Sequence, residues 1–267
     1  MKVYFSVFKM RLINGLQYRT AALAGMATQF FWGFMFIMIY EAFYQNGGAS
    51  QPISLEQLID YLWLQQAFLV FIMLWFRDNE IFNLITGGNI AYELCRPCDI
   101  YGFWYAKLIA QRLSGAMLRC LPILLIAFML PEPYRLSAPA GITAFVLFFA
   151  ALMLGLLVLA AISMFIYISV FKTMSPMGSL LMFCILGEFF AGLIIPIPLM
   201  PGWLQTIAYI LPFRLASDLP FRIYSGNIPV NEAVPGIFTQ IVWLAVLVLS
   251  GRALLVKALK KVVVQGG

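Results

Sequence analysis

The sequence predicts an all-α integral membrane protein with six transmembrane helices, and three observations lead to this fold class. Hydrophobic residues make up 63% of the 267 residues, and charged residues make up only 10%. Soluble domains usually carry about 25% charged residues, so this composition indicates a chain that is largely surrounded by lipid. The mean hydropathy is +0.93. Apolar stretches of about 20 residues, the length of a helix that crosses a bilayer, recur along the chain.

The six spans are expected at residues 22–44, 57–76, 108–130, 142–171, 177–199 and 234–256. Polar and proline-containing breaks separate them, most clearly at 131–133 and 172–176. Because no long polar linker divides the spans, we expect a single domain over residues 1–267.

The positions of Lys and Arg predict how the spans are oriented, because basic residues in short loops are retained on the cytoplasmic side. If both termini are cytoplasmic, twelve basic residues lie on the inner side: Lys2, Lys9, Arg11, Arg19, Arg77, Arg96, Lys107, Lys172, Arg252, Lys257, Lys260 and Lys261. Only Arg135, Arg214 and Arg222 then lie on the outer side. This asymmetry explains the net charge of +6 through topology and attraction to anionic membrane lipids, and no nucleic-acid partner is expected.

The absence of histidine and the small number of cysteines argue against metal and enzyme chemistry. Cys95 and Cys98 have the C-x-x-C spacing of redox dithiols and zinc knuckles, but Cys120 and Cys184 lie inside apolar runs and cannot complete a four-ligand site. Histidine, the commonest metal ligand and general base, is absent. We therefore expect no catalytic, cofactor-binding or metal-binding residues. An intramembrane enzyme that uses a lone Glu or Cys with a partner chain stays open.

The first 20 residues predict an amphipathic helix that lies at the membrane interface. Lys2, Ser6, Lys9 and Gln17 fall within one arc of a helical wheel, and apolar residues fill most of the rest. The alternative is a basic extension of the first span.

Residues 77–104 form the long loop on the predicted inner side. Asp78 and Asn79 can cap a short helix that Gly87 and Gly88 would end. Its apolar face would consist of Ile81, Phe82 and Ile85, and Ile90, Tyr92 and Leu94 then alternate toward the Arg96-Pro97 turn. An apolar loop needs a cover, which is either a partner protein or the protein's own spans.

Residues 195–232 are too apolar for a solvated loop, and prolines break them too often for one straight span. Short helices are expected at 203–211 and 213–223, and neither is long enough to cross a membrane. This outer segment is therefore expected to dip into the membrane and return, with its backbone buried against protein.

The order of these features, together with several short motifs, resembles the membrane (permease) subunit of type-2 ABC transporters, the ABC-2 family of export permeases. The motifs are I-P-I-P-L-M-P-G-W-L-Q at 195–205, Leu211-Pro212-Phe213, Leu219-Pro220, Tyr224-Ser225-Gly226, and the loop sequences I-T-G-G at 85–88 and L-C-R-P at 94–97. The resemblance implies a bacterial inner (plasma) membrane location and an outer re-entrant segment that contains Pro196, Pro198, Pro201, Trp203, Pro212, Phe213 and Pro220.

The same resemblance implies a dimer of permeases, identical or homologous, driven by a separate ABC ATPase subunit. No G-x-x-x-x-G-K-[ST] motif occurs here, so ATP and Mg would be bound by that partner. The loop would couple ATP hydrolysis to transport through Ile81, Phe82, Ile85, Gly87, Gly88, Leu94, Arg96 and Pro97. The expected substrate is amphipathic or hydrophobic, such as a drug, a peptide or a lipid-like compound.

Three ionisable residues inside the expected spans, Glu188, Arg112 and Arg119, are further candidates for the substrate path. Glu188 could contact a cationic substrate, act as counter-ion to either arginine, or be a neutral hydrogen-bonded acid. Both arginines could instead snorkel or bind lipid headgroups. An ATP-independent, proton-coupled secondary transporter that uses Glu188 is the alternative function. It is disfavoured because the sequence shows no inverted repeat and no matched pair of broken helices in the second and fifth spans.

Overall fold

The computed structural model describes residues 2–46 and 51–262, and within them the chain is helical and contains no strand. Four helices are long and apolar enough to cross a membrane: α2 (Arg19–Asn46), α7 (Ile100–Met129), α8 (Ile142–Thr173) and α12 (Val230–Leu259). They confirm the first, third, fourth and sixth expected spans. The all-helical membrane fold predicted from composition is thus supported at the level of four spans.

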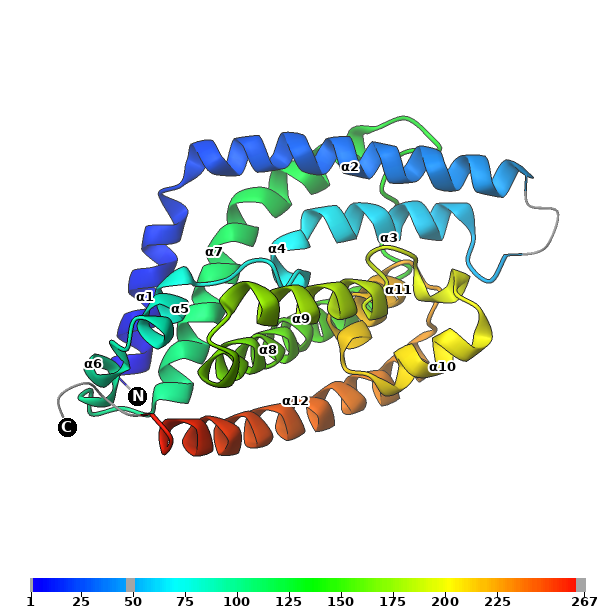
Figure 1. Ribbon diagram of the computed structural model, residues 1–267. Coiled ribbons are helices and arrows are strands. Elements are labelled where there is room, and N and C mark those ends of the chain that lie inside the picture. Colours follow the sequence, from blue (N-terminus) through cyan, green and yellow to red (C-terminus); the bar gives the residue numbers. More distant parts are fainter. Residues whose placement is uncertain (1, 47–50, 263–267) are drawn as a thin grey trace.

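Helix α8 forms the centre of the molecule and packs against α12, α7 and α9 (Figure 1). Its small residues allow close approach, because a Cβ on Gly155 would lie only 3.0 Å from the Leu215 carbonyl oxygen. Most of its second half, from Val158 to Tyr167, is buried. A helix that is apolar on every side is suited to this central position.

The second and fifth expected spans are shorter helices than the sequence indicates. Helix α3 (Leu55–Ala67) breaks at Phe68, continues as α4 (Leu69–Ile72), and gives way to irregular chain before residue 79. Helix α9 (Pro176–Phe190) ends well before residue 199. The second expected span is therefore interrupted and the fifth ends early, and in both stretches side chains from other helices hold the non-helical backbone.

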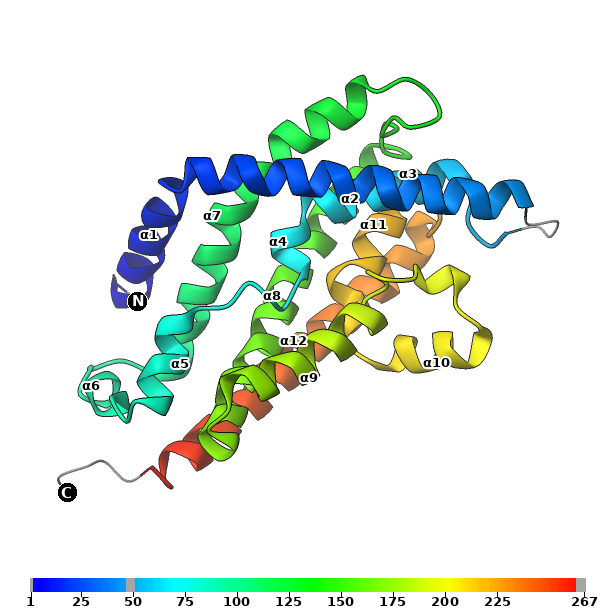
Figure 2. The same ribbon diagram turned by 45° about the horizontal axis from the view of Figure 1, so that its top comes forward.

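Helix α1 (Lys2–Leu16) is the N-terminal helix expected at the interface, and Met1 lies outside the described residues. It runs across the end of α2 instead of continuing its axis, and it packs along the first part of α7 (Figures 1 and 2). Val7 is buried in this contact, whereas Val3, Phe5 and Met10 are exposed. An exposed apolar face on a helix transverse to a long apolar one suits an interfacial position.

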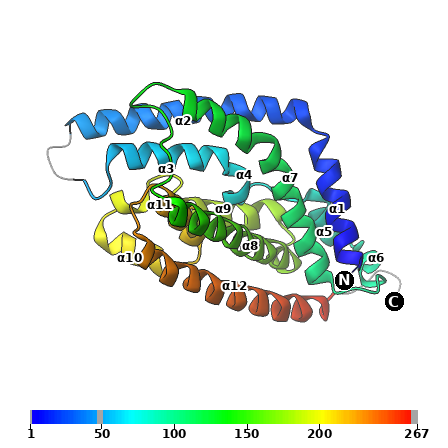
Figure 3. The same ribbon diagram turned by 180° about the vertical axis from the view of Figure 1, so that it is seen from behind.

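The remaining short helices lie at the two ends of the molecule (Figures 1 and 3). Helices α5 (Asn79–Thr86) and α6 (Ile90–Leu94) lie beside the start of α7 and the end of α12, and we name this the α5 end. Helices α10 (Gly202–Ile210) and α11 (Asp218–Tyr224), with the 3-10 turns η1 (Ile197–Leu199) and η2 (Phe213–Ala216), lie at the opposite α10 end. The first expected short helix of this segment is confirmed, and the second is divided at Ser217 into η2 and α11.

The irregular backbone near the α10 end is satisfied by buried side chains. Tyr61 and Gln65 of α3 donate hydrogen bonds to the carbonyls of Gly192 (3.1 Å) and Leu193 (2.8 Å). Gln240 of α12 donates to the Leu215 carbonyl at 2.7 Å. Non-helical backbone is stable in an apolar environment only when its polar groups have such partners, so this segment has the construction that membrane burial requires.

Candidate functional site

The segment that links α4 to α7 is the best-defined polar site of the chain, and it begins with the cap of α5. The Asp78 side chain accepts a hydrogen bond from the Glu80 amide at 2.9 Å, which is the N-cap geometry predicted from the sequence. The Asp78 amide donates to the Tyr167 hydroxyl of α8 at 2.7 Å. Gly87 ends the helix, and Gly88 has φ of 72°, a conformation that glycine adopts without strain. The expected start and stop of this helix are confirmed.

The apolar face of α5 is covered by the protein itself. Ile81, Phe82 and Ile85 are all buried, and the Phe82 ring lies 4.7 Å from that of Tyr167. The protein's own spans therefore cover the apolar face of α5, which was one of the two alternatives for this loop. A partner that binds here must contact other residues of the segment.

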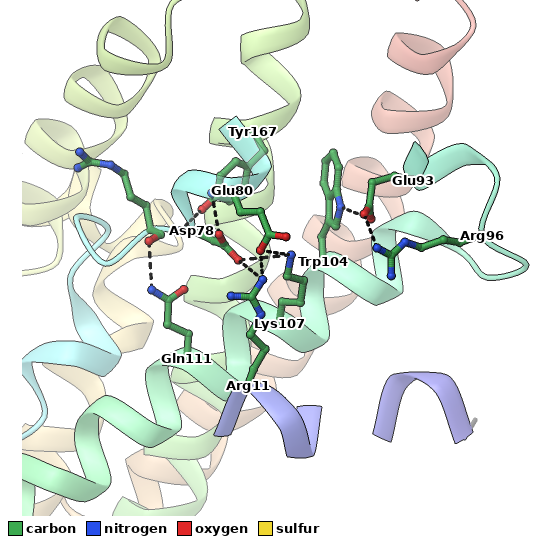
Figure 4. A network of polar contacts seen from close by, with 10 residues as sticks. Arg11, Asp78, Glu80, Glu93, Arg96, Trp104, Lys107, Gln111 and Tyr167 are labelled. Carbon is green, nitrogen blue, oxygen red and sulfur yellow. Dashed lines mark hydrogen bonds and ion pairs between the residues drawn. The ribbon is translucent and has the colours of Figure 1, made fainter. Parts of the chain in front are cut away.

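Four charged side chains fix α5 to its neighbours (Figure 4). The Lys107 ammonium of α7 lies 3.1 Å from the Glu80 carboxylate and 3.6 Å from that of Asp78. Arg11 of α1 pairs with the same two carboxylates. Lys107 is only 3% exposed, so this ion pair is partly desolvated and ties three helices together.

Sequence reasoning did not find this cluster. The sequence identifies Arg11 and Lys107 only as basic residues of one membrane side, and it does not mark Glu80 as their partner. The available signal was a pair of acidic residues in the first turn of a short helix, beside an excess of cations that lacked other partners. Arg11 and Lys107 are 69 and 27 residues from Glu80 in the chain, so local sequence patterns cannot indicate that they pair with it.

Residues 90–94 form helix α6, in which Ile90 is buried and Tyr92 and Leu94 are exposed. Glu93 turns inward: its carboxylate accepts a hydrogen bond from the Trp104 indole at 3.3 Å and pairs with Arg96 at 3.1 Å (Figure 4). The Arg96 guanidinium also lies 4.8 Å from the centre of the Phe103 ring. The Arg96-Pro97 turn is thus fastened to α7.

The two cysteines of the C-x-x-C sequence lie in this turn. Cys95 is exposed and Cys98 is half-buried, and both are free thiols. Among the residues the structure describes, no group of three metal-binding side chains comes together. Arg96 and Pro97 lie in the same turn, which connects α6 to the start of α7.

The outer side of α5 and α6 is the part of the segment that is open to a partner. Tyr92 is 73% exposed, and Leu94, Gly87 and Gly88 are also accessible. A groove of about 690 Å³ lies between these helices and the ends of α8 and α12, where Met174 and Lys261 line it. Of the coupling residues predicted from the sequence, Gly87, Gly88, Leu94, Arg96 and Pro97 are on this surface.

Arg112 is almost completely buried and holds the broken second span. Its guanidinium donates to the carbonyls of Val70 (3.0 Å), Met73 (2.6 Å) and Phe76 (3.1 Å), and to the Ser163 hydroxyl (3.0 Å). The carbonyls at the end of a helix carry partial negative charge and lack helical partners. Arg112 supplies those partners.

Glu188 pairs with neither arginine in the described part of the chain, so its proposed role as their counter-ion is not the observed one. The Trp75 indole hydrogen-bonds to its carboxylate, and one carboxylate oxygen is buried without a partner. Arg112 and Arg119 contact different elements. Arg119 lies against Gly25 of α2.

A second charged cluster, at the α10 end, was also missed. Asp218 is fully buried and pairs with Arg222 at 3.4 Å and with Arg214 at 4.0 Å. Arg222 donates to the Tyr209 hydroxyl, and the Arg214 guanidinium lies 4.2 Å from the centre of that ring. The cluster joins α10, η2 and α11.

The prolines expected in the outer segment take defined places. Pro198 lies in η1, Pro201 precedes α10, Pro212 precedes η2, and Pro220 lies in the first turn of α11. At these positions proline costs no helical hydrogen bond. Pro196 precedes η1, Trp203 is exposed, and Phe213 begins η2.

The fold and this site define the class of the protein, which is a multi-pass helical membrane protein with a rigidly anchored helical segment at one end. Comparison with protein-family models and with curated proteins finds no match.

Proposed function

We propose that the chain is the permease subunit of an ATP-driven exporter of the ABC-2 type. The α5 end would face the cytoplasm, because basic residues that the sequence assigns to the inner side gather there, among them Arg11, Arg96, Lys107 and Lys261, whereas Arg214 and Arg222 belong to η2 and α11. In this proposal the broken α3–α4 unit and α9 complete six crossings, and α10 and α11 dip into the outer leaflet.

One observation carries the proposal: α5 and α6 form a unit that is fixed to other helices and has an exposed outer surface. Ion pairs from Arg11 and Lys107 connect this unit to α1 and α7, and the buried Phe82 ring packs against Tyr167 of α8. A force on the exposed surface around Tyr92 would therefore be passed to three membrane-spanning or interfacial helices. A separate ATPase subunit, which binds ATP and Mg, would supply that force, and two permeases would form the path between them.

The exposed surfaces of the spans support the proposed substrate class. Helices α2, α9 and α12 expose many large apolar side chains, so a path at a dimer interface would be mainly apolar. This suits an amphipathic or hydrophobic cargo such as a drug, a peptide or a lipid-like compound.

The proposal is tested by affinity purification of the intact chain from its native membrane. An ABC ATPase and a second six-span chain, identical or homologous, should be recovered in stoichiometric amounts. A chain with Tyr92→Ala and Leu94→Ser should recover much less ATPase, whereas Trp203→Ala at the α10 end should recover as much as the wild type. Recovery of the chain without any nucleotide-binding protein would count against the proposal.

The second candidate, a proton-coupled secondary transporter, gains support from one observation. The two interrupted segments pack together, since the Leu74 side chain lies against Gly187 and the Trp75 indole against Glu188. Short or broken helices in two places are typical of secondary transporters. Transport into vesicles separates the two functions: uptake driven by a proton gradient without nucleotide, and lost in Glu188→Gln, would favour the second.

A further inference from the structure

A cleft lies beneath the bend between α1 and α2, where both helices face α7. Its two connected parts have volumes of about 170 and 380 Å³, and Gly15, Tyr18, Gln111 and Ser114 line both of them. Because α1 leaves the axis of α2 at this bend, the cleft opens at the level where an interfacial helix would lie.

Arg119 lines the narrower part of the cleft, and its charge has no counter-ion. Among the described residues, the guanidinium makes no hydrogen bond or ion pair with a side chain or carbonyl, and its buried Nε has no acceptor. By contrast, Arg11 in the wider part is neutralised by Asp78 and Glu80. A half-buried arginine without an acceptor is costly in an apolar environment unless a ligand supplies the missing anion.

Arg119 lies close to the start of α2. Its guanidinium lies against Gly25, where an added Cβ would be 2.7 Å from the arginine Cζ. Gly25 is six residues after Arg19, the first residue of α2, which corresponds to about 9 Å along the helix. Beside it, apolar side chains line the narrower part of the cleft: Val70, Leu118 and Phe76, whose ring centre lies 5.9 Å from the Arg119 Cζ. A charged group with an apolar surface beside it fits a phosphate with attached acyl chains.

We propose that this cleft binds an anionic phospholipid of the leaflet at the α5 end. The Arg119 guanidinium holds the phosphate through paired N–H donors, and the polar wall around Gln111 and Asn14 accommodates the headgroup. The acyl chains begin along the apolar side chains that line the narrower part of the cleft. The lipid would thereby brace the joint between α1 and α2. The proposal depends on the membrane orientation given above but not on an ATPase partner.

The test uses the full chain, delipidated in a neutral detergent and titrated with dioleoyl phosphatidylglycerol or dioleoyl phosphatidylcholine in native mass spectrometry. We expect the first phosphatidylglycerol to bind about tenfold more tightly than phosphatidylcholine, the size of one charge-assisted contact. Arg119→Gln should reduce this preference to about twofold or less. The matched control Arg135→Gln, at the α10 end, should keep it.

Three results would overturn the proposal. They are an equal affinity of the wild type for the two lipids, an unchanged preference in Arg119→Gln, and displacement of phosphatidylglycerol by excess inorganic phosphate, which would indicate a phosphate site instead. Circular dichroism and size-exclusion elution show whether each variant is folded. If Arg119→Gln is not, Arg119→Lys decides: it keeps the charge but loses the paired donors, so the preference should fall about threefold, and an unchanged preference contradicts the proposal.

Discussion

The ammonium of Lys107 on α7 lies 3.1 Å from the carboxylate of Glu80 on α5, across a contact that also holds Asp78 and Arg11. Lys107 is buried while Glu80 is half-exposed, so the pair joins a desolvated cation to a carboxylate that reaches water. This pairing converts a loop between two spans into a rigid attachment, because α5 cannot turn without separating the charges.

The first prediction concerns this attachment. Lys107→Met keeps the length of the side chain but leaves Asp78 and Glu80 with Arg11 alone, so we expect the chain to lose about 1–2 kcal/mol of stability. Thermal unfolding in detergent measures the loss. Lys172→Met is the control, because Lys172 is exposed and forms no ion pair within the described residues. Equal melting of the two variants would show that the cluster does not hold α5.

The second prediction concerns Arg112 and the broken span. Arg112→Met removes the donors to the carbonyls of Val70, Met73 and Phe76, and we expect a loss of about 3 kcal/mol or more. Arg112→Lys should restore only part of it, because an ammonium lacks the planar fork that reaches several carbonyls at once. Unfolding midpoints of both variants are compared with that of the wild type. If Arg112→Lys were as stable as the wild type, a positive charge alone, without the planar guanidinium, would be enough to hold these carbonyls.

The third prediction concerns the contact between α8 and η2. Gly155→Val would place side-chain atoms within 3.0 Å of the Leu215 carbonyl and the Ala216 Cα, and backbone cannot move aside as a side chain can. We expect a loss of about 2–3 kcal/mol. Gly202→Ala is the matched control, since an added Cβ there meets nothing within 4 Å. Unchanged stability of Gly155→Val would contradict the tight packing of these two backbones.

The fourth prediction separates the two sides of the α5–α6 segment. Phe82→Ala empties a site that is 4% exposed and should cost about 3–4 kcal/mol, with low yield of folded protein. Tyr92→Ala changes an exposed side chain and should leave stability within about 0.5 kcal/mol. If the proposed function holds, Tyr92→Ala nevertheless lowers nucleotide-driven transport in reconstituted vesicles. Wild-type transport by Tyr92→Ala would place the docking surface elsewhere.

The charge-free stretches and the prolines were sufficient to predict much of this fold. Spans α2, α7, α8 and α12 follow from apolar length, which is a property of the local sequence. The cap at Asp78, the stop at Gly87 and Gly88, and the two short helices around Pro212 also follow, because caps, left-handed glycines and prolines act within a few residues.

The interrupted spans and the charged clusters could not be predicted in the same way. The 57–76 stretch is apolar throughout its second half, and nothing within it marks the end of α4. The helix stops at Ile72 because Arg112, some 40 residues later in the chain, donates to its free carbonyls. Likewise Lys107 and Glu80, or Arg222 and Tyr209, become partners only when the helices pack. The sequence by itself determined an all-helical membrane chain and the local limits of most helices, since these depend on hydrophobicity and backbone preference. Which charges meet, what covers the apolar face of α5, and where the second span breaks were decided by the tertiary structure, because those contacts join residues distant in the chain.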